Sequence, residues 1–332
     1  MTEATNPALL EAARGGPFPR ADRVAAGVLC IPIPFQRSDR LRYTLCYAIA
    51  DSDGGTHLLD AGYPSSEGLE VLDAALLANG FGPVRSAVFT HDHIDHAGSV
   101  DMLRSRGSIA VIAGPPGATV KGGRPRNAAE APRRLDEWGV PRSEREALPG
   151  PPPGDTHVAT LAPDLVAEDG DLLPVPGRRL RLIATPGHTG GHICLHDEDQ
   201  DLLFTGDHVL PILNPGLGLG GEFATNPVRA YLDSLRRVQE YDSAEACPGH
   251  EYRFRGLASR AEAIANHHLR RTREVAEALA VRPRSTIWEI AARLSWTAGW
   301  ETLRHERFIW SALSQTEFHA EFVRSGEAAS YL

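Results

Sequence analysis

Short hydrophobic runs and helically spaced apolar positions alternate along the first third of the chain. The runs are rich in β-forming residues, which is typical of strands. The expected strands are residues 28–34, 43–51, 57–60, 86–90 and 109–113. Helical periodicity covers residues 67–78, which stop at Asn79-Gly80, and residues 100–106. This alternation predicts an α/β layered core.

A second strand-rich block follows and then gives way to helices. The expected strands are residues 161–166, 179–185, 192–197 and 202–205. Residues 226–241 have amphipathic helical spacing, with Asn226 as the N-cap and Pro227 in the first turn. Further helices are expected at residues 260–281, 286–294 and 302–324. The chain therefore passes from a layered core to a helical C-terminal segment.

Residues 114–155 interrupt the alternation of predicted strands and helices. They are dense in Gly, Pro and Arg, with one helical stretch at 128–138. Two interpretations are equally open: a surface insertion, or a lid that contacts substrate, because long loops on a rigid scaffold often carry specificity. The expected organisation is a leader at 1–25, a catalytic domain at 26–258 that contains this insertion, and a helical domain at 259–332.

The composition narrows the classes of function. A hydrophobic fraction of 42% in 332 residues is enough for a substantial core, and the net charge of −9 argues against a general nucleic-acid binder. The four cysteines form no C-x-x-C pair, which favours reduced thiols over a zinc knuckle. The N-terminus has no apolar core of signal-peptide length, and no run approaches the ~18 apolar residues of a membrane span. We therefore expect a soluble, cytoplasmic protein without membrane contact.

Candidate chemistry concentrates in the stretch Thr90-His-Asp-His-Ile-Asp-His-Ala-Gly98, directly after a predicted strand. Alternate side chains of a tight loop can point inward, so His91 and His93 can share one ion. The donors that can turn toward a second ion are Asp95 and His96. Imidazole and carboxylate are ligands that zinc, iron and manganese accept. Further candidates follow later strands in glycine-containing turns: His188, Asp207 and His250.

With these motifs the sequence resembles the metallo-β-lactamase superfamily and its H-x-H-x-D-H pattern, over about residues 25–255. The resemblance implies a four-layer αβ/βα sandwich: two mixed sheets face to face, helices outside, metals in a cleft at one edge, and here a C-terminal helical extension. It assigns His91, His93 and His188 to a first metal. It assigns Asp95, His96 and His250 to a second metal, and the carboxylate of Asp207 to both.

The resemblance also implies supporting residues and a mechanism. Asp60, in the stretch Leu-Leu-Asp-Ala-Gly, matches a position that orients a ligand histidine; His192 and His208 are expected to support ligands rather than to bind metal. Two divalent ions are expected, with zinc as the default and iron or manganese as alternatives. They would supply a bridging hydroxide at working pH, and Asp95 is the expected proton acceptor during its attack.

The C-terminal segment resembles the winged-helix-like tail of one subgroup of the superfamily, the lactamase-beta-2-like and glyoxalase II-like proteins. The matching stretches are Phe204-Thr-Gly-Asp-His-Val-Leu-Pro211, Thr286-Ile-Trp-Glu-Ile-Ala-Ala-Arg293 and Ala312-Leu-Ser-Gln-Thr-Glu-Phe-His319. From Asn266 to Leu332 the nine Lys/Arg and eight Asp/Glu give a net charge of +1, which is not the basic face of a DNA reader. We expect no DNA partner, a tail that packs against the core and shapes the cleft, and a homodimer as an open option.

Hydrolysis of a small ester-like substrate is the leading prediction: a thioester, ester or lactone, either free or linked to an acyl carrier. The alternative is metal-dependent phosphodiester hydrolysis, as in the ribonuclease branches of the superfamily, which the acidic net charge disfavours. An iron site that reduces oxygen or nitric oxide is disfavoured, because superfamily members with that activity carry an appended flavin domain and this chain has no room for one. A DNA-binding regulator fits least, and periplasmic β-lactam cleavage is disfavoured by the absence of a signal peptide.

Overall fold

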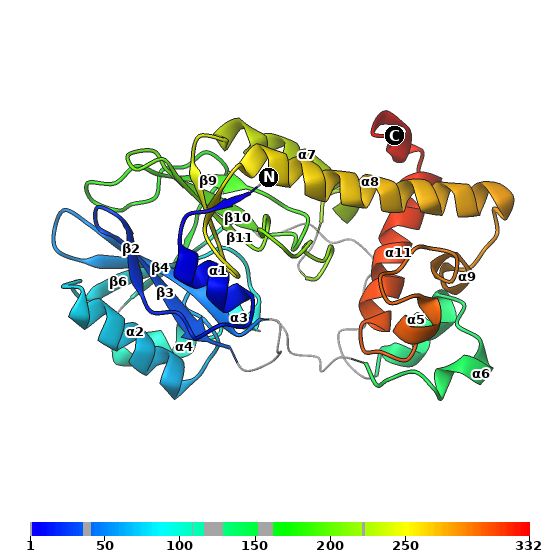
Figure 1. Cartoon of the computed structure of the whole chain (residues 1–332), viewed down its shortest axis with the longest axis horizontal. Helices are drawn as coiled ribbons and strands as arrows, with labels where there is room; N and C mark the ends of the chain where they lie inside the picture. The colour runs from blue at the N-terminus through cyan, green and yellow to red at the C-terminus, as the bar shows by residue number, and fades with distance from the viewer. Residues whose placement is uncertain (1, 36–40, 108, 116–128, 152–161, 221–222) are drawn as a thin grey trace.

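Two β-sheets lie face to face in the N-terminal two thirds of the chain, with helices on their outer sides (Figure 1). The structure is a computed structural model that describes residues 2–35, 41–107, 109–115, 129–151, 162–220 and 223–332. The first sheet has the strand order β2 (Asp22–Ala25), β3 (Val28–Pro34), β4 (Tyr43–Ala50), β5 (Thr56–Leu59), β6 (Val84–Phe89), β7 (Ala110–Ala113) and β8 (Leu165–Val166). It is antiparallel from β2 to β5 and parallel from β5 to β8.

The second sheet is built from the N-terminal residues and the middle of the chain. Its order is β1 (Glu3–Ala4), β13 (Phe254–Arg255), β12 (Glu245–Pro248), β11 (Leu202–Gly206), β10 (Ile193–Asp197) and β9 (Leu180–Ala184). Only β11 and β12 run parallel to each other. Residues 1–25 were expected to be a loose leader, but the described ones form β1, α1 (Pro7–Ala13) and β2.

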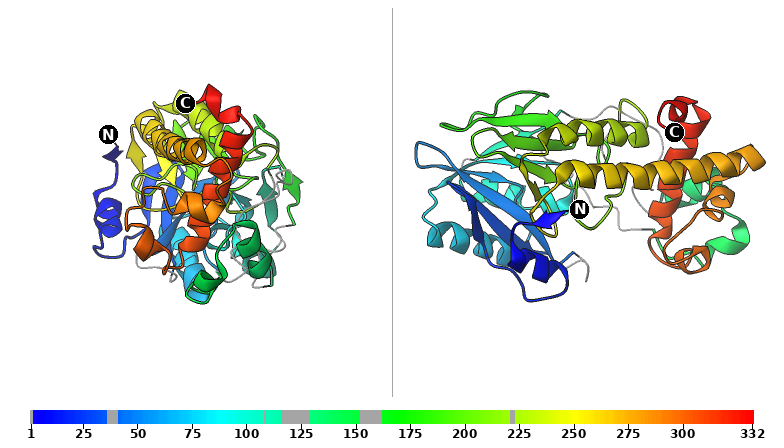
Figure 2. Two further views of the ribbon diagram at one scale, coloured as in Figure 1. Left: turned by 90° about the vertical axis from the view of Figure 1, so that its right-hand side faces the viewer. Right: turned by 45° about the horizontal axis from the view of Figure 1, so that its top comes forward.

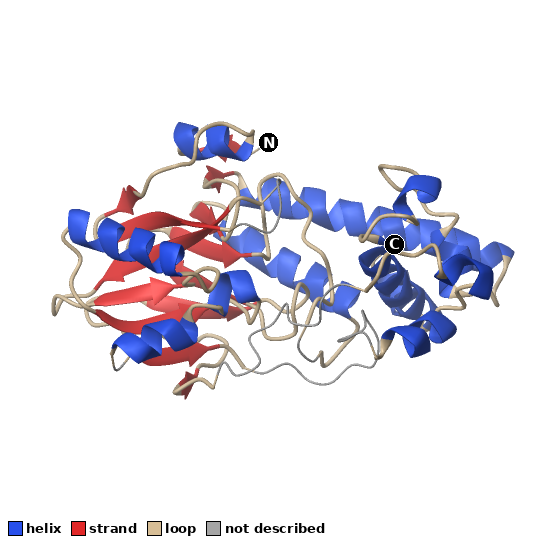
Figure 3. Cartoon of the chain, turned by 90° about the horizontal axis from the view of Figure 1, so that it is seen from below, coloured by secondary structure: helices blue, strands red, loops and turns tan. Residues whose placement is uncertain are grey.

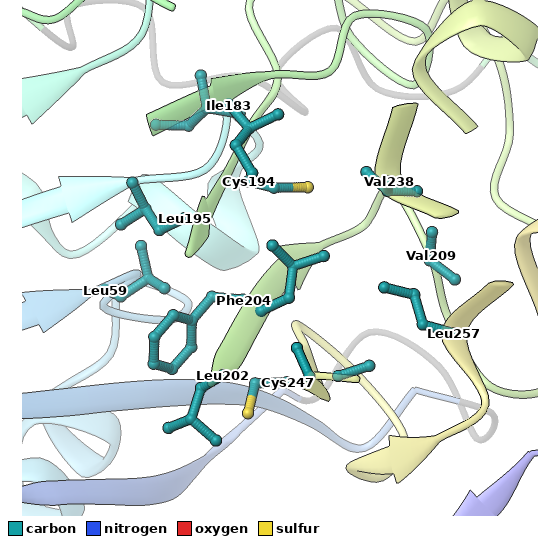
Figure 4. Close-up of a cluster of buried hydrophobic side chains, with 14 of the residues drawn as sticks. Leu59, Ile183, Cys194, Leu195, Leu202, Phe204, Val209, Val238, Cys247 and Leu257 are labelled. Carbon is teal, nitrogen blue, oxygen red and sulfur yellow. The ribbon is translucent and has the colours of Figure 1, made fainter. Parts of the chain in front are cut away.

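The main core fills the space between the two sheets. Along β4, alternate residues point to opposite sides: Leu45 and Tyr47 join the cluster between the sheets, and the Tyr47 ring lies 5.0 Å from that of Phe204. Figure 4 shows part of this cluster, with side chains from both sheets. The residues between them, Cys46 and Ala48, belong to a second cluster under the outer helices. A strand buried on both faces explains why β4 is apolar throughout instead of alternating.

The outer helices are α2 (Ser66–Ala78), α3 (Ile94–Ala97), α4 (Val100–Arg106) and α7 (Pro227–Val238), which continues as a 3-10 turn to Tyr241. Three of the four outer helices follow the sequence signals closely, and α3 lies where a tight loop was expected. The Ser65 hydroxyl accepts from Gly68 N and caps α2, and the Asn226 side chain accepts from Val228 N and caps α7. Figure 3 shows helices on the side of the sheets seen from below. The expected sandwich with C-terminal helices is confirmed.

The C-terminal region is attached through one long helix, α8 (Leu257–Val281), which begins beside the sheets and extends past them (Figures 1 and 2). Beyond it lie α9 (Ile287–Ala291), α10 (Trp300–Leu303) and α11 (Ile309–Arg324). The single helix expected at 302–324 is therefore wrong, because residues 304–308 separate α10 from α11. The structure describes every residue from 256 to 332 and assigns no strand there, so this region has no β-wing.

The described part of the insertion packs against these C-terminal helices. Its helices are α5 (Ala131–Glu137) and α6 (Arg142–Arg145). Trp138 is fully buried in a third cluster with Trp288 and Trp310, and its carbonyl accepts from Trp288 N at 3.0 Å. The lid interpretation falls largely on residues 116–128 and 152–155, which lie outside the described residues. Among described residues, no helix is long and apolar enough to cross a membrane.

A buried histidine in α11 makes the stability of the fold depend on pH. His319 Nδ1 donates to Thr272 Oγ1 at 2.9 Å, because that hydroxyl itself donates to His268 O. Its Nε2 is buried without a hydrogen-bond partner among the described residues. Burial, with nearby Arg271 and His267, lowers the pKa of His319 to about 3. Folding therefore favours the neutral ring, whereas the unfolded chain takes up a proton below about pH 6.5.

We expect acid to destabilise the protein through this residue. Between pH 6.5 and pH 5 the unfolded state binds the extra proton, so roughly 2 kcal/mol of the free energy of unfolding should be lost in the wild type. His319→Gln should remove that part of the slope, as measured by urea unfolding at pH 7.5 and 5.0. The exposed His305→Gln is the matched control. Equal pH dependence in His319→Gln and wild type would contradict the assignment.

Candidate metal centre

Seven predicted ligands come together at one end of the two sheets. Four lie in the turn after β6 and in α3, and the others follow β9, β11 and β12. Each therefore follows the carboxyl end of a strand, where α/β folds commonly place functional groups. They form two groups of donor atoms, and within each group the atoms lie within 4.8 Å of one another. The groups are His91, His93, His188 and Asp207, and Asp95, His96 and His250.

The spacing of the donor atoms suits divalent ions. At a bond length of about 2.0–2.1 Å, the ligand nitrogens of a tetrahedral zinc lie roughly 3.3 Å apart. His188 Nε2 lies 3.2 Å from His93 Nδ1, and His96 Nε2 lies 3.3 Å from His250 Nε2. In the second group, His250 Nε2 lies 3.4 Å from Asp95 Oδ2. Ring nitrogens that face each other at this distance share a cation readily, so the donor set fits metal ions.

The carboxylate of Asp207 connects the two groups. Its Oδ1 lies 3.5 Å from the Nε2 atoms of both His96 and His250, and its Oδ2 lies 3.7 Å from His188 Nε2. Oδ1 is buried without a hydrogen-bond donor among the described residues. A buried carboxylate oxygen without a hydrogen bond is costly unless a cation satisfies it. Asp207 therefore has the position expected of a ligand shared between two ions.

Each of the five candidate histidine ligands uses its far ring nitrogen for a contact with the protein. Such outer contacts select the tautomer and orient the ring, so that the other nitrogen presents a lone pair to the ion. The contacts are His91 Nδ1 with Thr90 Oγ1 (3.0 Å), His93 Nε2 with Leu219 O (3.2 Å), His96 Nδ1 with Asp60 Oδ2 (2.8 Å), His188 Nδ1 with Gly216 O (2.8 Å) and His250 Nδ1 with Tyr43 O (3.0 Å).

Asp60 supports the metal loop from a strained position at the end of β5. Its φ of +56° is in the left-handed region, which is uncommon for a non-glycine residue. Oδ1 accepts from Thr90 N at 2.8 Å, and Oδ2 accepts from Thr90 Oγ1 at 2.9 Å and from His96 Nδ1. One buried carboxylate thus fixes both the start of the metal loop and one of its histidines. The predicted role of Asp60, the orientation of a ligand histidine, stays a prediction to which this contact with His96 lends a geometry.

His192 and His208 lie beside the donor groups and belong to neither. His192 Nε2 accepts from Asp207 N at 3.2 Å and its Nδ1 contacts Thr185 Oγ1 at 2.9 Å, so both of its nitrogens are used by the protein. The His208 ring packs against Tyr231, with centroids 4.9 Å apart. His192 thus contacts the backbone of a candidate ligand, whereas neither ring nitrogen of His208 has a hydrogen-bond partner among the described residues. Their supporting roles stay predictions.

The glycine-rich loop after Pro211 forms a wall of the site. Its described residues, 211–220, provide the carbonyls of Gly216 and Leu219 to His188 and His93. Gly218 has a φ of +62°, and a Cβ there would lie 2.2 Å from the Phe318 ring of α11. The loop is thus held between the metal centre and the C-terminal helix. Sequence reasoning missed these carbonyls, since any residue type can provide one.

The electrostatic environment keeps the site's carboxylates ionised. Burial raises the pKa of Asp207, but His250 and His96 outweigh it and hold that pKa well below its usual value. Burial lowers the pKa of His96, but Asp207 and Asp60 outweigh it and raise that pKa well above its usual value. Burial and the neighbouring imidazoles hold the pKa of His91 well below its ordinary value. Metal binds ionised carboxylates and neutral imidazoles, so the neutral His91 is already in its binding form, whereas an ion would have to displace a proton from His96.

A substitution at Asp60 tests whether its carboxylate orients His96 for metal binding. Asp60→Asn keeps the size and tolerates the left-handed backbone, but it cannot offer His96 a charged acceptor. We expect metal affinity at the second group to fall by about 10–100-fold, measured by competition with a chelator. The surface carboxylate Asp73, which pairs with Arg106, provides the control Asp73→Asn. Unchanged metal affinity in Asp60→Asn would contradict the role.

Comparisons with known proteins agree with this geometry. A family model described as the metallo-beta-lactamase superfamily matches residues 39–250. The human protein named acyl-coenzyme A thioesterase MBLAC2 is 34% identical over 129 residues, which cover 37% of this chain and 40% of that protein. An atrochrysone carboxyl ACP thioesterase of Aspergillus fumigatus is 31% identical over 111 residues, 33% of each chain. The matches thus span two fifths or less of the length of these two relatives.

One relative and two solved structures match over a larger part of the chain. Lactamase-like protein adaB of Aspergillus niger is 26% identical over 225 residues, 67% of this chain and 54% of that protein. A metallo-beta-lactamase family protein from Thermus thermophilus has a TM-score of 0.66 at 24% identity and covers 92% of this chain and 95% of its own. A beta-lactamase domain protein from Burkholderia ambifaria has a TM-score of 0.65 at 22% identity, with coverages of 92% and 90%. These structural likenesses show the fold.

Proposed function

This chain belongs to the metallo-beta-lactamase superfamily, and we propose that it is a hydrolase that uses two divalent ions to cleave acyl thioesters. The observation that carries the proposal is the pair of donor groups joined by Asp207. Two relatives whose names describe thioesterases, one acting on acyl-coenzyme A and one on an acyl carrier protein, support the thioester as the substrate.

The residues of the site divide the work between holding ions and moving a proton. The first ion would be held by His91, His93 and His188, the second by Asp95, His96 and His250, and both by Asp207. When bound, such ions polarise a carbonyl oxygen and acidify water. The far nitrogen of each ligand histidine contacts the protein, which restricts the rotation of the ring. The site therefore needs little rearrangement when the carbonyl group of the substrate arrives.

Asp95 is the group suited to accept a proton from the attacking water. It is the one member of the two donor groups that is half-buried, whereas the other six are buried. Burial raises its pKa, but the hydrogen bond from His250 and the nearby His96 outweigh it and hold that pKa far below its usual value. Asp95 is therefore ionised at neutral pH and reachable by water, as a proton acceptor must be.

Zinc is the proposed metal, because a set of five imidazoles and two carboxylates with tetrahedral spacing suits it. We expect the purified protein to contain zinc at about two equivalents, measured by elemental analysis. Removal with a chelator should abolish turnover, and zinc should restore it. If only iron or manganese restores turnover, that ion is the metal instead of zinc. Full activity of the metal-free protein would contradict metal dependence.

The substrate class is tested by parallel assays on a panel of acyl thioesters and on labelled single-stranded RNA. We expect thioester turnover with the RNA left intact, and Asp95→Ala should lower kcat by about 10²–10⁴-fold because the proton acceptor is lost. Asp101→Ala, at an exposed position of the neighbouring helix α4, is the control. RNA cleavage that is lost in Asp95→Ala, without thioester turnover, would replace the proposal with a phosphodiesterase.

A further inference from the structure

A pocket of about 400 Å³ lies next to the metal centre on the side of His250. It is formed by the C-terminal end of α1 with Arg14, the start of β4 with Arg42 and Tyr43, and Ile212 of the glycine-rich loop. Figure 3 shows α1 outside the two sheets, near the N-terminus. The side chains of these residues take no part in the proposed hydrolysis, although the backbone carbonyl of Tyr43 orients His250.

The pocket shares a wall with the second donor group. His250 Nδ1 donates to Tyr43 O at 3.0 Å, and Tyr43 Oη donates to Glu251 O at 2.8 Å. Tyr43 and Glu251 both line the pocket. A ligand histidine and the pocket therefore both contact Tyr43, and Glu251 of the lining directly follows His250 in the chain.

The pocket is cationic. Arg14 makes no side-chain hydrogen bond or ion pair with any part of the chain that the structure describes, and Arg42 uses one guanidinium nitrogen for Gly16 O. The one carboxylate in the lining is already engaged, because Glu251 accepts from the backbone N–H groups of Ile212 and Leu213 at 2.8 and 3.2 Å. Two guanidinium groups with free donors are suited to phosphate oxygens.

Two exposed apolar side chains lie at or near this charged space: Ile212 lines it, and Phe18, outside the lining, packs on Tyr43. Ile212 is 49% exposed at its edge. Phe18 is 41% exposed, and its ring lies 5.7 Å from that of Tyr43. Large apolar side chains at the rim of a cationic pocket suit a ligand that carries both phosphate groups and an apolar or aromatic part.

We propose that this pocket binds the phosphate-bearing nucleotide end of coenzyme A, so that an acyl-coenzyme A is the thioester presented to the metals. The inference rests on the proposed function for the thioester and goes beyond it in naming the carrier and the residues that select it. Coenzyme A has a diphosphate and a ribose phosphate at one end and the thioester at the other, joined by a flexible arm. Its two ends can therefore occupy two adjacent sites at once.

Binding of coenzyme A and of pantetheine, which lacks the nucleotide and all phosphates, tests the pocket by calorimetry on the metal-loaded full chain. We expect coenzyme A to bind more tightly than pantetheine. Arg14→Gln and Arg42→Gln should each raise the Kd for coenzyme A by about five- to tenfold, as expected for a partly exposed charged contact. Arg20→Gln, an exposed arginine of the same segment outside the lining, should keep the wild-type Kd.

Arg42→Gln also removes the hydrogen bond to Gly16 O. Arg42→Lys, which keeps the charge, is therefore the control and should retain most of the affinity for coenzyme A. Equal Kd values for coenzyme A and pantetheine, or wild-type affinity in both glutamine variants, would overturn the inference. Thioester turnover together with either result would leave the proposed function standing. Arginine-dependent binding of coenzyme A without turnover of any acyl thioester would instead refute the proposed function and keep the pocket.

Discussion

The carboxylate of Asp207 lies between the two groups of metal-binding side chains. The geometry of the site therefore depends on the backbone conformation that positions this carboxylate. Gly206, directly before it, has a φ of +47°, and a Cβ there would lie 2.7 Å from Thr90 Oγ1. The ends of β11 and β6, one from each sheet, therefore approach closely at this point. Backbone hydrogen bonds between the two sheets reinforce the approach, because Ile193 N donates to Thr90 O and Leu45 N donates to Gly249 O. Packing of the two sheets thus sets the distance between the ligands that each sheet provides.

Local signals in the sequence predicted much of the fold. The helix over 67–78 and the helix capped by Asn226 are found within a few residues of their expected bounds, because capping and periodicity act within the segment itself. The pairing of β1 with β13 joins residues about 250 positions apart, and no local pattern indicates it. The break between α10 and α11 was missed because residues 304–308 contain no glycine or proline that would indicate the end of a helix.

The candidate site was predictable to the extent that it uses side chains. His91 and its neighbours form a dense motif, and their supporting carboxylate Asp60 has a recognisable context. Two of the acceptors that orient the ligand histidines are backbone carbonyls of the glycine-rich loop, and a carbonyl has the same chemistry in every residue. The pocket near Arg14 was not foreseen either, because it is formed by segments that meet only through the packing of α1 against β4 and the glycine-rich loop.

The contact between Gly218 and the Phe318 ring has a consequence for the modularity of the chain. The loop that orients two histidines of the first donor group is covered by α11, which belongs to the C-terminal region. The Asn226 side chain, which caps α7, also donates to Phe318 O at 3.0 Å. The C-terminal helices therefore stabilise the loop that orients these metal-binding histidines. A minimal catalytic unit cut after the last strand would lose the support of its own metal ligands, so the two regions form one functional module.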